Sequence, residues 1–393
     1  MARTNDSPFR AGFGKTPPML AGRDSILDDF SASLAEGTWS TERTMLIEGL
    51  RGVGKTVLLN ALEDAARERG WLVVSETATP GFLDRITHGH LQRAIDQLDP
   101  PATRRLTGGG TAGVSITTET VSPRQYPTTL RDQLTTLANL LTPRGILITL
   151  DEINGATIDE LADFAAEHQH AIRNDQEIAF VGAGLRNAIR DALSHRSLTF
   201  LRRSLRPPID FLDYDDATDA LRIPILDRGR TIGDAALDYA VRATQGYPFL
   251  AQLIGDLAWK QSPDQTEISL DDVKHAYRRA RRTMGSNIHE PSLSDLSHTD
   301  RTVLAHMAAD DGPTAVSDVR EALGVTAQYL NVYRQRLIDA GMIVPAGRGM
   351  VDIAMPYLRE YLRDHIVSDA TVNRAMSRTS FPPPPALDEE SSA

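Results

Sequence analysis

A single glycine-rich turn limits what this chain can fold into more than any other feature of the sequence. Residues Gly49-Leu50-Arg51-Gly52-Val53-Gly54-Lys55-Thr56 fit the pattern G-x-x-x-x-G-K-[ST]. An apolar run over residues 44–48 precedes the turn, and an amphipathic stretch over residues 55–69 follows it. With Trp71-Leu72-Val73-Val74 as the next strand, this order predicts a βαβ unit and therefore a parallel sheet.

The residue types in this turn suit a triphosphate. Glycines let the backbone curl so that successive N–H groups face phosphate oxygens, and the helix that starts at Lys55 adds partial positive charge. The Lys55 ammonium can reach the β- and γ-phosphates, and the Thr56 hydroxyl can bind Mg²⁺. Only four of the 42 basic residues are lysines, so the pattern seldom arises by chance. We expect ATP and Mg²⁺ to be contacted by Gly49, Arg51, Gly52, Val53, Gly54, Lys55, Thr56 and Val57.

Two carboxylates end a second apolar strand. Residues 145–150 form the continuous apolar run that is typical of a central parallel strand, and Asp151 and Glu152 follow directly. Buried carboxylates are costly unless a cation faces them, and the carboxyl ends of parallel strands line the ligand crevice. We interpret Asp151 as a Mg²⁺ ligand and Glu152 as the group that orients or deprotonates the attacking water. An acidic turn that only caps a following helix is the alternative.

Composition excludes several other kinds of site. The chain has no cysteine, which removes disulfides, thiolate zinc sites and cysteine nucleophiles and suits a reducing cytoplasm. We expect no secretory signal and no membrane span, because no run approaches roughly 18 apolar residues. The net charge of −11 argues against nucleic-acid binding over the whole surface. Two histidine pairs lack a spaced third metal ligand, and we interpret them as surface histidines: His88 with His90, and His168 with His170.

The remaining apolar spacing predicts further strands and a long helical region. A helix is expected after Gly22, and further strands are expected at residues 178–181 and 209–212. An insertion at residues 105–127 is interpreted as a hairpin or a flexible segment. Helices are predicted within residues 213–282 at 217–221, 233–244, 248–259 and 270–282.

The two motifs, roughly 95 residues apart, resemble the Walker A and Walker B elements of the AAA+ and related STAND ATPases. Leu20-Ala21-Gly22-Arg23-Asp24 resembles the family's box at the mouth of the nucleotide site. Gly246-Tyr247-Pro248-Phe249 resembles the G-x-P motif that replaces the sensor-2 arginine in STAND-like members. The resemblance implies nucleotide contacts for Arg23 and Pro248 and makes Arg202 a candidate γ-phosphate finger. Over about residues 8–365 the chain is similar to a group of actinobacterial ATP-binding proteins.

Some of these assignments have plainer alternatives. Arg23 could instead be a structural charge near the start of a helix. Arg202 could be an ordinary solvent-exposed charge, and the turn before Pro248 could serve only to end a helix. The strand that carries sensor 1 in the family reads Phe180-Val181-Gly182-Ala183-Gly184-Leu185 here and offers no side-chain donor. We therefore expect water to be poorly positioned and turnover to be slow.

Residues 291–367 have the pattern of a small helical module with a hairpin. Helices are expected at 300–309, 315–323 and 326–340, with a short gap at Gly324-Val325 typical of helix-turn-helix. A hairpin is expected between 342–344 and 351–353, and the whole resembles a winged helix. On the third helix we expect Leu330, Leu337 and Ile338 to face the core, and Gln328, Tyr329, Asn331, Arg334 and Gln335 to face outward, as suits base edges and phosphates.

The charge of this module leaves its partner open. It carries seven arginines against ten Asp and Glu residues, a poor electrostatic footprint for DNA. A dense basic cluster precedes it, and this cluster fits either the cations of a helix C-terminus or a phosphate contact. The cluster consists of Lys274, Arg278, Arg279, Arg281 and Arg282.

These patterns together predict an α/β fold in which a P-loop parallel-sheet core is followed by a helical lid and a C-terminal winged helix. The predicted parts are an extended N-terminal arm (1–20), the core (21–212), the lid (213–286), the winged helix (287–368) and a disordered tail (369–393). The function predicted is a cytoplasmic, ATP-binding switch with slow Mg-dependent hydrolysis and DNA or an unidentified protein as output partner. The alternative is a DNA-binding regulator or initiator-like protein in which ATP is mainly structural. Self-association into a homo-oligomer is left open.

Overall fold

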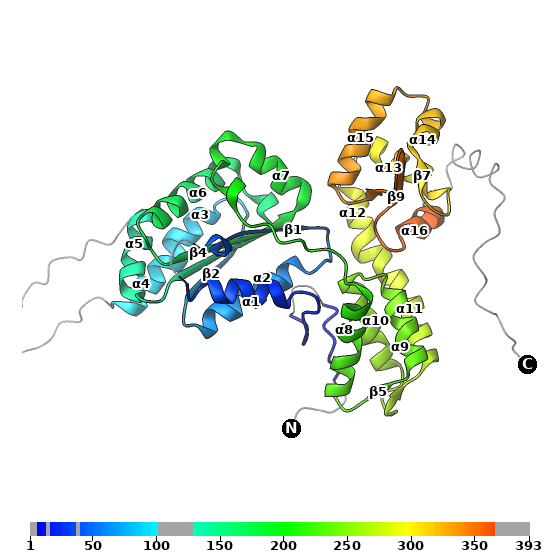
Figure 1. Cartoon of the computed structure of the whole chain (residues 1–393), viewed down its shortest axis with the longest axis horizontal. Coiled ribbons are helices and arrows are strands. Elements are labelled where there is room, and N and C mark those ends of the chain that lie inside the picture. Colours follow the sequence, from blue (N-terminus) through cyan, green and yellow to red (C-terminus); the bar gives the residue numbers. More distant parts are fainter. Residues whose placement is uncertain (1–5, 13–15, 37–39, 101–128, 366–393) are drawn as a thin grey trace, which may run out of the picture. The chain divides into compact units, whose positions relative to one another are not determined.

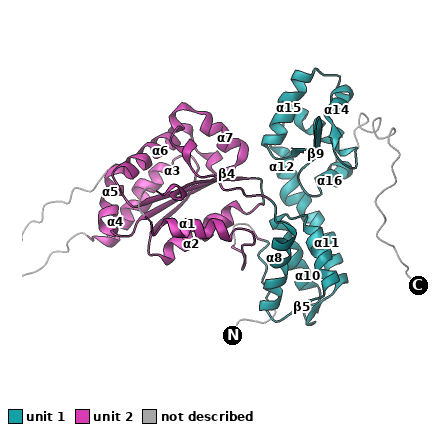
Figure 2. Ribbon diagram, in the orientation of Figure 1, with its two compact units in different colours: residues 1–11, 50–52, 211–393 teal, residues 12–49, 53–210 magenta. Residues whose placement is uncertain are grey.

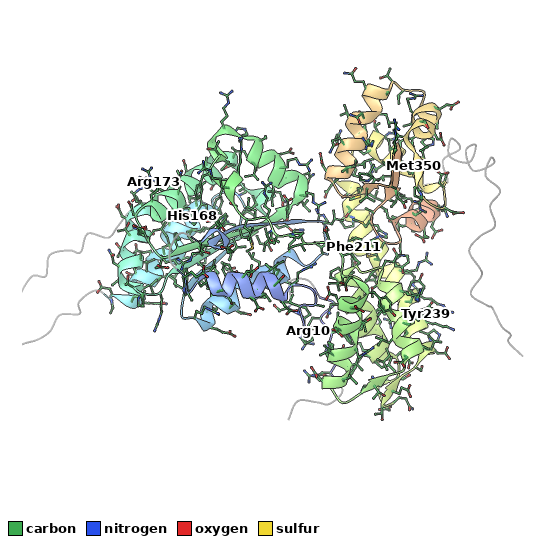
Figure 3. All side chains as sticks on the ribbon, viewed as in Figure 1. Arg10, His168, Arg173, Phe211, Tyr239 and Met350 are labelled. Carbon is green, nitrogen blue, oxygen red and sulfur yellow. The ribbon has the colours of Figure 1, made fainter. Side chains whose placement is uncertain are left out.

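The computed structural model describes residues 6–12, 16–36, 40–100 and 129–365 (Figure 1). The chain divides into two compact units (Figure 2). The first, called the sheet unit here, comprises residues 12–49 and 53–210, and the second, the helical unit, comprises residues 1–11, 50–52 and 211–393. Two predicted segments lie outside the described residues, namely the insertion at 105–127 and the tail at 369–393.

A four-stranded parallel sheet forms the centre of the sheet unit. Its strands run in the order β1 (Thr44–Gly49), β4 (Ile178–Leu185), β3 (Ile146–Asp151) and β2 (Leu72–Thr77). The two central strands are buried along almost their whole length, which explains why they read as uninterrupted apolar runs. The predicted α/β class and parallel sheet are confirmed.

Helices cover both faces of this sheet (Figure 1). On one face lie α1 (Asp24–Ser33) and α2 (Lys55–Glu68), the helix that follows the glycine-rich turn. Apolar side chains of the other face, such as Ile148 and Phe180, share one hydrophobic core with the opposite helices. Those helices are α3 (Phe82–Asp84), α4 (Gln92–Leu98), α5 (Leu130–Leu141), α6 (Ile158–Arg173) and α7 (Arg186–Ser194).

The prediction of a fifth strand at residues 209–212 is wrong, because these residues form no strand. The chain instead makes one parallel bridge to β1, at Leu205, where Leu205 N donates to Thr44 O (2.9 Å) and Leu46 N donates to Leu205 O (2.8 Å). Pro207 and Pro208 follow. Since proline has no backbone N–H, the pairing cannot continue along β1.

The interpretation of His168 as a surface residue is also wrong. Its side chain is fully buried on α6 and packs against the rings of Phe164, Phe180 and Phe200. His168 Nε2 lies 3.0 Å from Thr44 Oγ1. Burial lowers the pKa of His168 to about 3, so the imidazole is neutral in the folded protein. Within the described residues no group of three or more His, Asp and Glu side chains is arranged to hold a metal ion.

The first part of the helical unit is a bundle of helices with one two-stranded parallel sheet, formed by β5 and β6. The predicted helices are present, and α8 continues beyond its predicted end. Near the start of the chain, Phe9 is buried against Gly255 of the bundle, and Arg10 N donates to Gln252 Oε1 (3.0 Å). The elements are α8 (Tyr214–Asp227), β5 (Thr231–Ile232), α9 (Asp234–Thr244), α10 (Pro248–Gln261), β6 (Glu267–Ile268), α11 (Leu270–Met284) and α12 (Glu290–Ser294).

The last described part contains four helices and a small antiparallel sheet of order β7-β9-β8. The three predicted helices and the predicted hairpin are all present, and α16 is an additional helix. On α15, Leu330 and Leu337 are buried as expected, whereas Ile338 is only half-buried. The elements are α13 (His298–Ala308), β7 (Thr314–Ala315), α14 (Val316–Leu323), α15 (Ala327–Asp339), β8 (Ile343–Pro345), β9 (Met350–Ile353) and α16 (Leu358–His365). None of the described helices has the length and apolar character needed to cross a membrane.

Candidate nucleotide-binding site

The glycine-rich turn leaves the end of β1 and leads into α2 through two left-handed backbone positions. Gly52 has φ +73° and Gly54 has φ +95°, conformations that side chains with a Cβ rarely adopt. Gly54 is also the N-cap of α2, and no side chain caps that helix end. Helix ends of this kind, preceded by a glycine-rich turn and without a side-chain cap, are where proteins commonly bind phosphate.

Lys55 lies against the start of the same turn. Its side chain is buried, with only 7 % of its surface exposed, and its Nζ donates to the carbonyl of Gly49 (3.2 Å). Gly49 has no room for a side chain, because a Cβ there would lie 2.8 Å from Val53 Cγ2. The lysine ammonium and the backbone of the turn are thus held together before any phosphate arrives.

Thr56 and Asp151 meet although they belong to different motifs. Thr56 stands in the first turn of α2 and Asp151 at the end of β3, and Thr56 Oγ1 donates to Asp151 Oδ2 at 2.7 Å. A hydroxyl and a carboxylate side by side are hard oxygen ligands of the kind that Mg²⁺ prefers. The structure therefore brings together the two side chains predicted to bind the metal.

Glu152 has an unusual backbone for a residue with a side chain. Its φ is +52°, and its N–H donates to Asp151 Oδ1 at 2.9 Å. The next residues form a short 3₁₀ turn, Ile153–Gly155, and the Glu152 side chain is exposed. Left-handed backbone at such positions persists where the surroundings demand it, and it is frequent at functional sites.

Apolar side chains crowd the position at which a side chain of residue 182 in β4 would stand. A Cβ at Gly182 would lie 2.2 Å from Ile153 Cδ1 and 3.0 Å from Leu46 Cδ2. The residue that follows Ile153, Asn154, turns its Oδ1 toward the N–H of Leu185 at 3.5 Å. The missing donor at Gly182 therefore has a packing cause, and Asn154 is a polar residue at the end of β4 that sequence reasoning missed.

A buried polar contact between α2 and β3 was also missed. Thr149 Oγ1 donates to Glu63 Oε1 at 2.6 Å, and Glu63 accepts a second bond from Arg67 Nη2 at 2.8 Å. Both Thr149 and Glu63 are buried. The signal in the sequence was a carboxylate that directly follows the apolar Leu62 within the amphipathic stretch at residues 55–69. This contact fixes the helix of the glycine-rich turn on the strand that carries Asp151.

The two predicted arginines of the sheet unit bind backbone carbonyls. Arg23 is buried and donates to the carbonyls of Asp210 (2.6 Å) and Gly22 (3.1 Å). Arg202 donates to three carbonyls at the C-terminal end of α7, those of Leu193 (2.6 Å), Ser194 (3.0 Å) and His195 (3.3 Å). The contacts of Arg202 satisfy the carbonyls that a helix C-terminus leaves without intrahelical partners.

The remaining predicted contacts belong to the helical unit. Pro248 occupies the first turn of α10, where a proline costs nothing because its missing N–H would be unpaired anyway. The Arg51 guanidinium forms an ion pair with Asp295 at 2.8 Å, and both side chains are largely exposed. The turn before Pro248 requires glycine, since Gly246 has φ +72° and a Cβ there would lie 2.3 Å from the carbonyl of Leu212.

Comparisons with known proteins agree with this arrangement. The model of the AAA ATPase domain family matches residues 19–220, and that of a domain of unknown function matches residues 286–362. No curated protein matches the chain.

Two solved structures share the fold of most of the chain. A Walker-type ATPase of Pyrococcus abyssi is 15% identical with a TM-score of 0.63, and the match covers 92% of this chain and 100% of that one. The ORC2 protein of Aeropyrum pernix, solved as ADPNP–ADP complexes, is 14% identical with a TM-score of 0.60, and the match covers 93% and 98%.

Proposed function

Because this chain belongs to the AAA ATPase domain family, we propose that it binds Mg-ATP and works as a nucleotide-dependent switch with slow hydrolysis. The observation that carries the proposal is the hydrogen bond from Thr56 to Asp151 beside the uncapped start of α2. In this arrangement the helix end that we propose for the phosphates lies beside the two oxygens that we propose for the metal. The ORC2 relative, solved with ADPNP and ADP, supports a nucleotide as the ligand.

The residues present fit a magnesium-bound triphosphate. Thr56 and Asp151 would hold the metal, and the backbone of Gly52 to Lys55 would hold the phosphates. Bound Mg²⁺ would neutralise the charge that develops on the phosphate oxygens. Lys55 would move its ammonium from the Gly49 carbonyl to the phosphates, a short displacement for a long flexible side chain.

Hydrolysis would depend on Glu152. Its carboxylate would orient a water and accept the proton that the water loses as it attacks the γ-phosphate. The crowding at Gly182 supports slow turnover, because Ile153 fills the space that a polar side chain there would need. Arg23 and Pro248 complete the proposed nucleotide contacts.

The proposal for Arg202 as a γ-phosphate finger needs its own test, because its guanidinium already binds three carbonyls of α7. Arginine fingers supplied in trans raise turnover about 10³-fold or more. For a finger in trans, Arg202→Gln would lower hydrolysis on that scale, and an equal mixture with Glu152→Gln subunits would regain activity. If Arg202 only caps the C-terminal end of α7, Arg202→Gln would lower the melting temperature and leave the rate of ATP hydrolysis unchanged. Size-exclusion chromatography with ATP shows whether copies associate at all.

For the output module we propose a winged helix made by β7, α14, α15 and the β8–β9 hairpin, as in STAND-like ATPases. Gln328, Tyr329, Asn331 and Gln335 are exposed on α15 and support a macromolecular contact there. DNA is one candidate partner, opposed by the acidic balance of this region, and a protein is the other. We place the protein in the cytoplasm, which its lack of cysteine suits.

The site is tested by titrating ATP into the purified protein. Wild type should bind Mg-ATP, and Lys55→Ala should lose most of the affinity; equal binding by both proteins would show that the site is assigned wrongly. The DNA alternative is tested by fluorescence anisotropy at several salt concentrations. Affinity that is absent at low salt, or that is unchanged by Arg334→Gln and Arg348→Gln, would exclude DNA as the partner of this module.

A further inference from the structure

Three residues of the glycine-rich turn, Leu50–Gly52, pack with the helical unit rather than with the sheet. The hydroxyl of Tyr247 donates a hydrogen bond to the backbone carbonyl of Arg51. Tyr247 lies directly before α10 and is completely buried. The G-x-P motif predicted a role for its proline, whereas the contact to the turn is made by the residue between the glycine and the proline.

The phenol of Tyr247 fills the space over Gly52. A Cβ at Gly52 would lie 2.2 Å from the Tyr247 hydroxyl and 2.7 Å from the ring carbon that carries it. Gly52 is therefore required twice, once for its φ of +73° and once for the approach of the phenol.

Aromatic neighbours hold Tyr247 in place. Its ring makes edge contacts with Phe211 (centroids 5.4 Å apart) and Phe249 (6.4 Å), and the Leu212 N–H donates to the Gly246 carbonyl at 2.7 Å. Burial raises the pKa of the Tyr247 phenol well above its usual range. The hydroxyl thus keeps its proton and remains a donor at any physiological pH.

The geometry of one peptide unit connects this contact to phosphate binding. The carbonyl of Arg51 and the N–H of Gly52 belong to the same planar trans peptide and point in opposite directions. A donor that holds the carbonyl on one side therefore turns the N–H to the other side. No partner for the Gly52 N–H exists in the described part of the chain.

We propose that Tyr247 is a positioning residue for the phosphate-binding loop, which holds the Arg51–Gly52 peptide so that the Gly52 N–H is aimed at a phosphate oxygen of the bound nucleotide. The proposal rests on the proposed function, since it assumes that the loop binds a nucleotide. Without the hydroxyl, this peptide can rotate. Binding of the phosphate must then also order the peptide, and the loss of conformational entropy lowers the affinity for the nucleotide. Tyr247 touches no phosphate itself and acts only through the backbone.

The test compares two phenol-to-carbonyl hydrogen bonds of the same unit. Tyr247→Phe removes only the hydroxyl over the loop. Tyr357→Phe removes a matched hydroxyl, because the buried Tyr357 donates to the carbonyl of Ala243 at 2.6 Å. Calorimetric titration with Mg-ATP and Mg-ADP should show about a tenfold loss of affinity in Tyr247→Phe and unchanged affinity in Tyr357→Phe. Hydrogen exchange of the peptide that spans residues 50–57 should be faster only in Tyr247→Phe.

The outcomes separate the two proposals. If wild type binds no nucleotide, the proposed function fails. If wild type binds and Tyr247→Phe binds equally well, or if both variants lose the same affinity, only the role of Tyr247 is refuted. Should Tyr247→Phe melt below the assay temperature, Phe211→Leu serves instead, because it keeps the Tyr247 hydroxyl and loosens the ring that carries it. A smaller loss of nucleotide affinity is then expected. Unchanged affinity in Phe211→Leu would refute the role of Tyr247.

Discussion

Thr56 and Asp151 share a hydrogen bond of 2.7 Å across the space between the first turn of α2 and the end of β3. Neither motif alone defines a metal site, since Thr56 supplies one hydroxyl and Asp151 one carboxylate. The parallel order β1-β4-β3-β2 brings the ends of β1 and β3 to the same edge of the sheet. The Thr56–Asp151 pair is consequently the feature on which magnesium dependence should rest.

Removing the Thr56 hydroxyl should weaken the magnesium-dependent part of ATP binding. Thr56→Val keeps the size of the side chain and loses the oxygen, so we expect ATP affinity with Mg²⁺ to fall about tenfold, on the order of 1.4 kcal/mol. With EDTA present, wild type and variant should bind alike. Thr56→Ser is the control that keeps the oxygen. A Thr56→Val protein whose affinity still rises with Mg²⁺ as in wild type would contradict the role.

Glu152→Gln should separate binding from turnover. The amide keeps the shape of the side chain but cannot take a proton, so ATP hydrolysis should fall by about 10²–10⁴-fold while ATP affinity stays within about twofold. Phosphate release and calorimetric titration measure the two quantities. Asp159→Asn removes another exposed carboxylate, in the first turn of α6, and should leave both unchanged. Equal turnover in wild type and Glu152→Gln would rule out Glu152 as the base.

Thr149→Val should destabilise the sheet unit although it changes little in volume. It leaves the buried Glu63 carboxylate without the 2.6 Å bond from the Thr149 hydroxyl, which costs about 1–3 kcal/mol. Thr149→Ser retains the hydroxyl and should lose less. Urea unfolding of the two variants and wild type, followed by circular dichroism, measures the difference. A Thr149→Val protein as stable as wild type would show that Glu63 finds its partners elsewhere.

Acid should destabilise the protein through His168. The unfolded imidazole titrates near pH 6.5, and burial lowers the folded pKa to about 3. The unfolded chain therefore binds the extra proton first, so the contribution of His168 is complete above pH 6.5 and is lost as the pH falls from 6.5 toward 3. Between pH 7 and pH 5 this amounts to about 2 kcal/mol.

The measurement compares the pH dependence of unfolding rather than a single stability. His168→Gln removes the titrating group, and its free energy of unfolding should fall less steeply between pH 7 and pH 5 than that of wild type. The exposed His195 provides the control, since His195→Gln should keep the wild-type slope. Identical slopes in wild type and His168→Gln would show that His168 is accessible to protons in the folded state.

Local features of the sequence were sufficient to predict the glycine-rich turn between a strand and a helix, the acidic strand end and the helices that follow. The reason is that glycine spacing, a continuous apolar run and 3.6-residue periodicity each act over a few neighbouring residues. Gly52 and Gly54 adopt the left-handed backbone for which glycine is needed, and β3 is buried as its apolar run requires. The family resemblance also singled out β4 as a strand without a polar side chain at residues 182–184, although not the packing at Gly182.

Only the tertiary structure decided the contacts between residues that lie far apart in the sequence. Pairing along β1 stops at Leu205 because two prolines follow, His168 is buried because three aromatic rings surround it, and Ile153 fills the space beside Gly182. The hydroxyl of Tyr247 meets the carbonyl of Arg51 across 196 residues. Such contacts follow from which surfaces pack together, and the periodicity of a single segment carries no information about them.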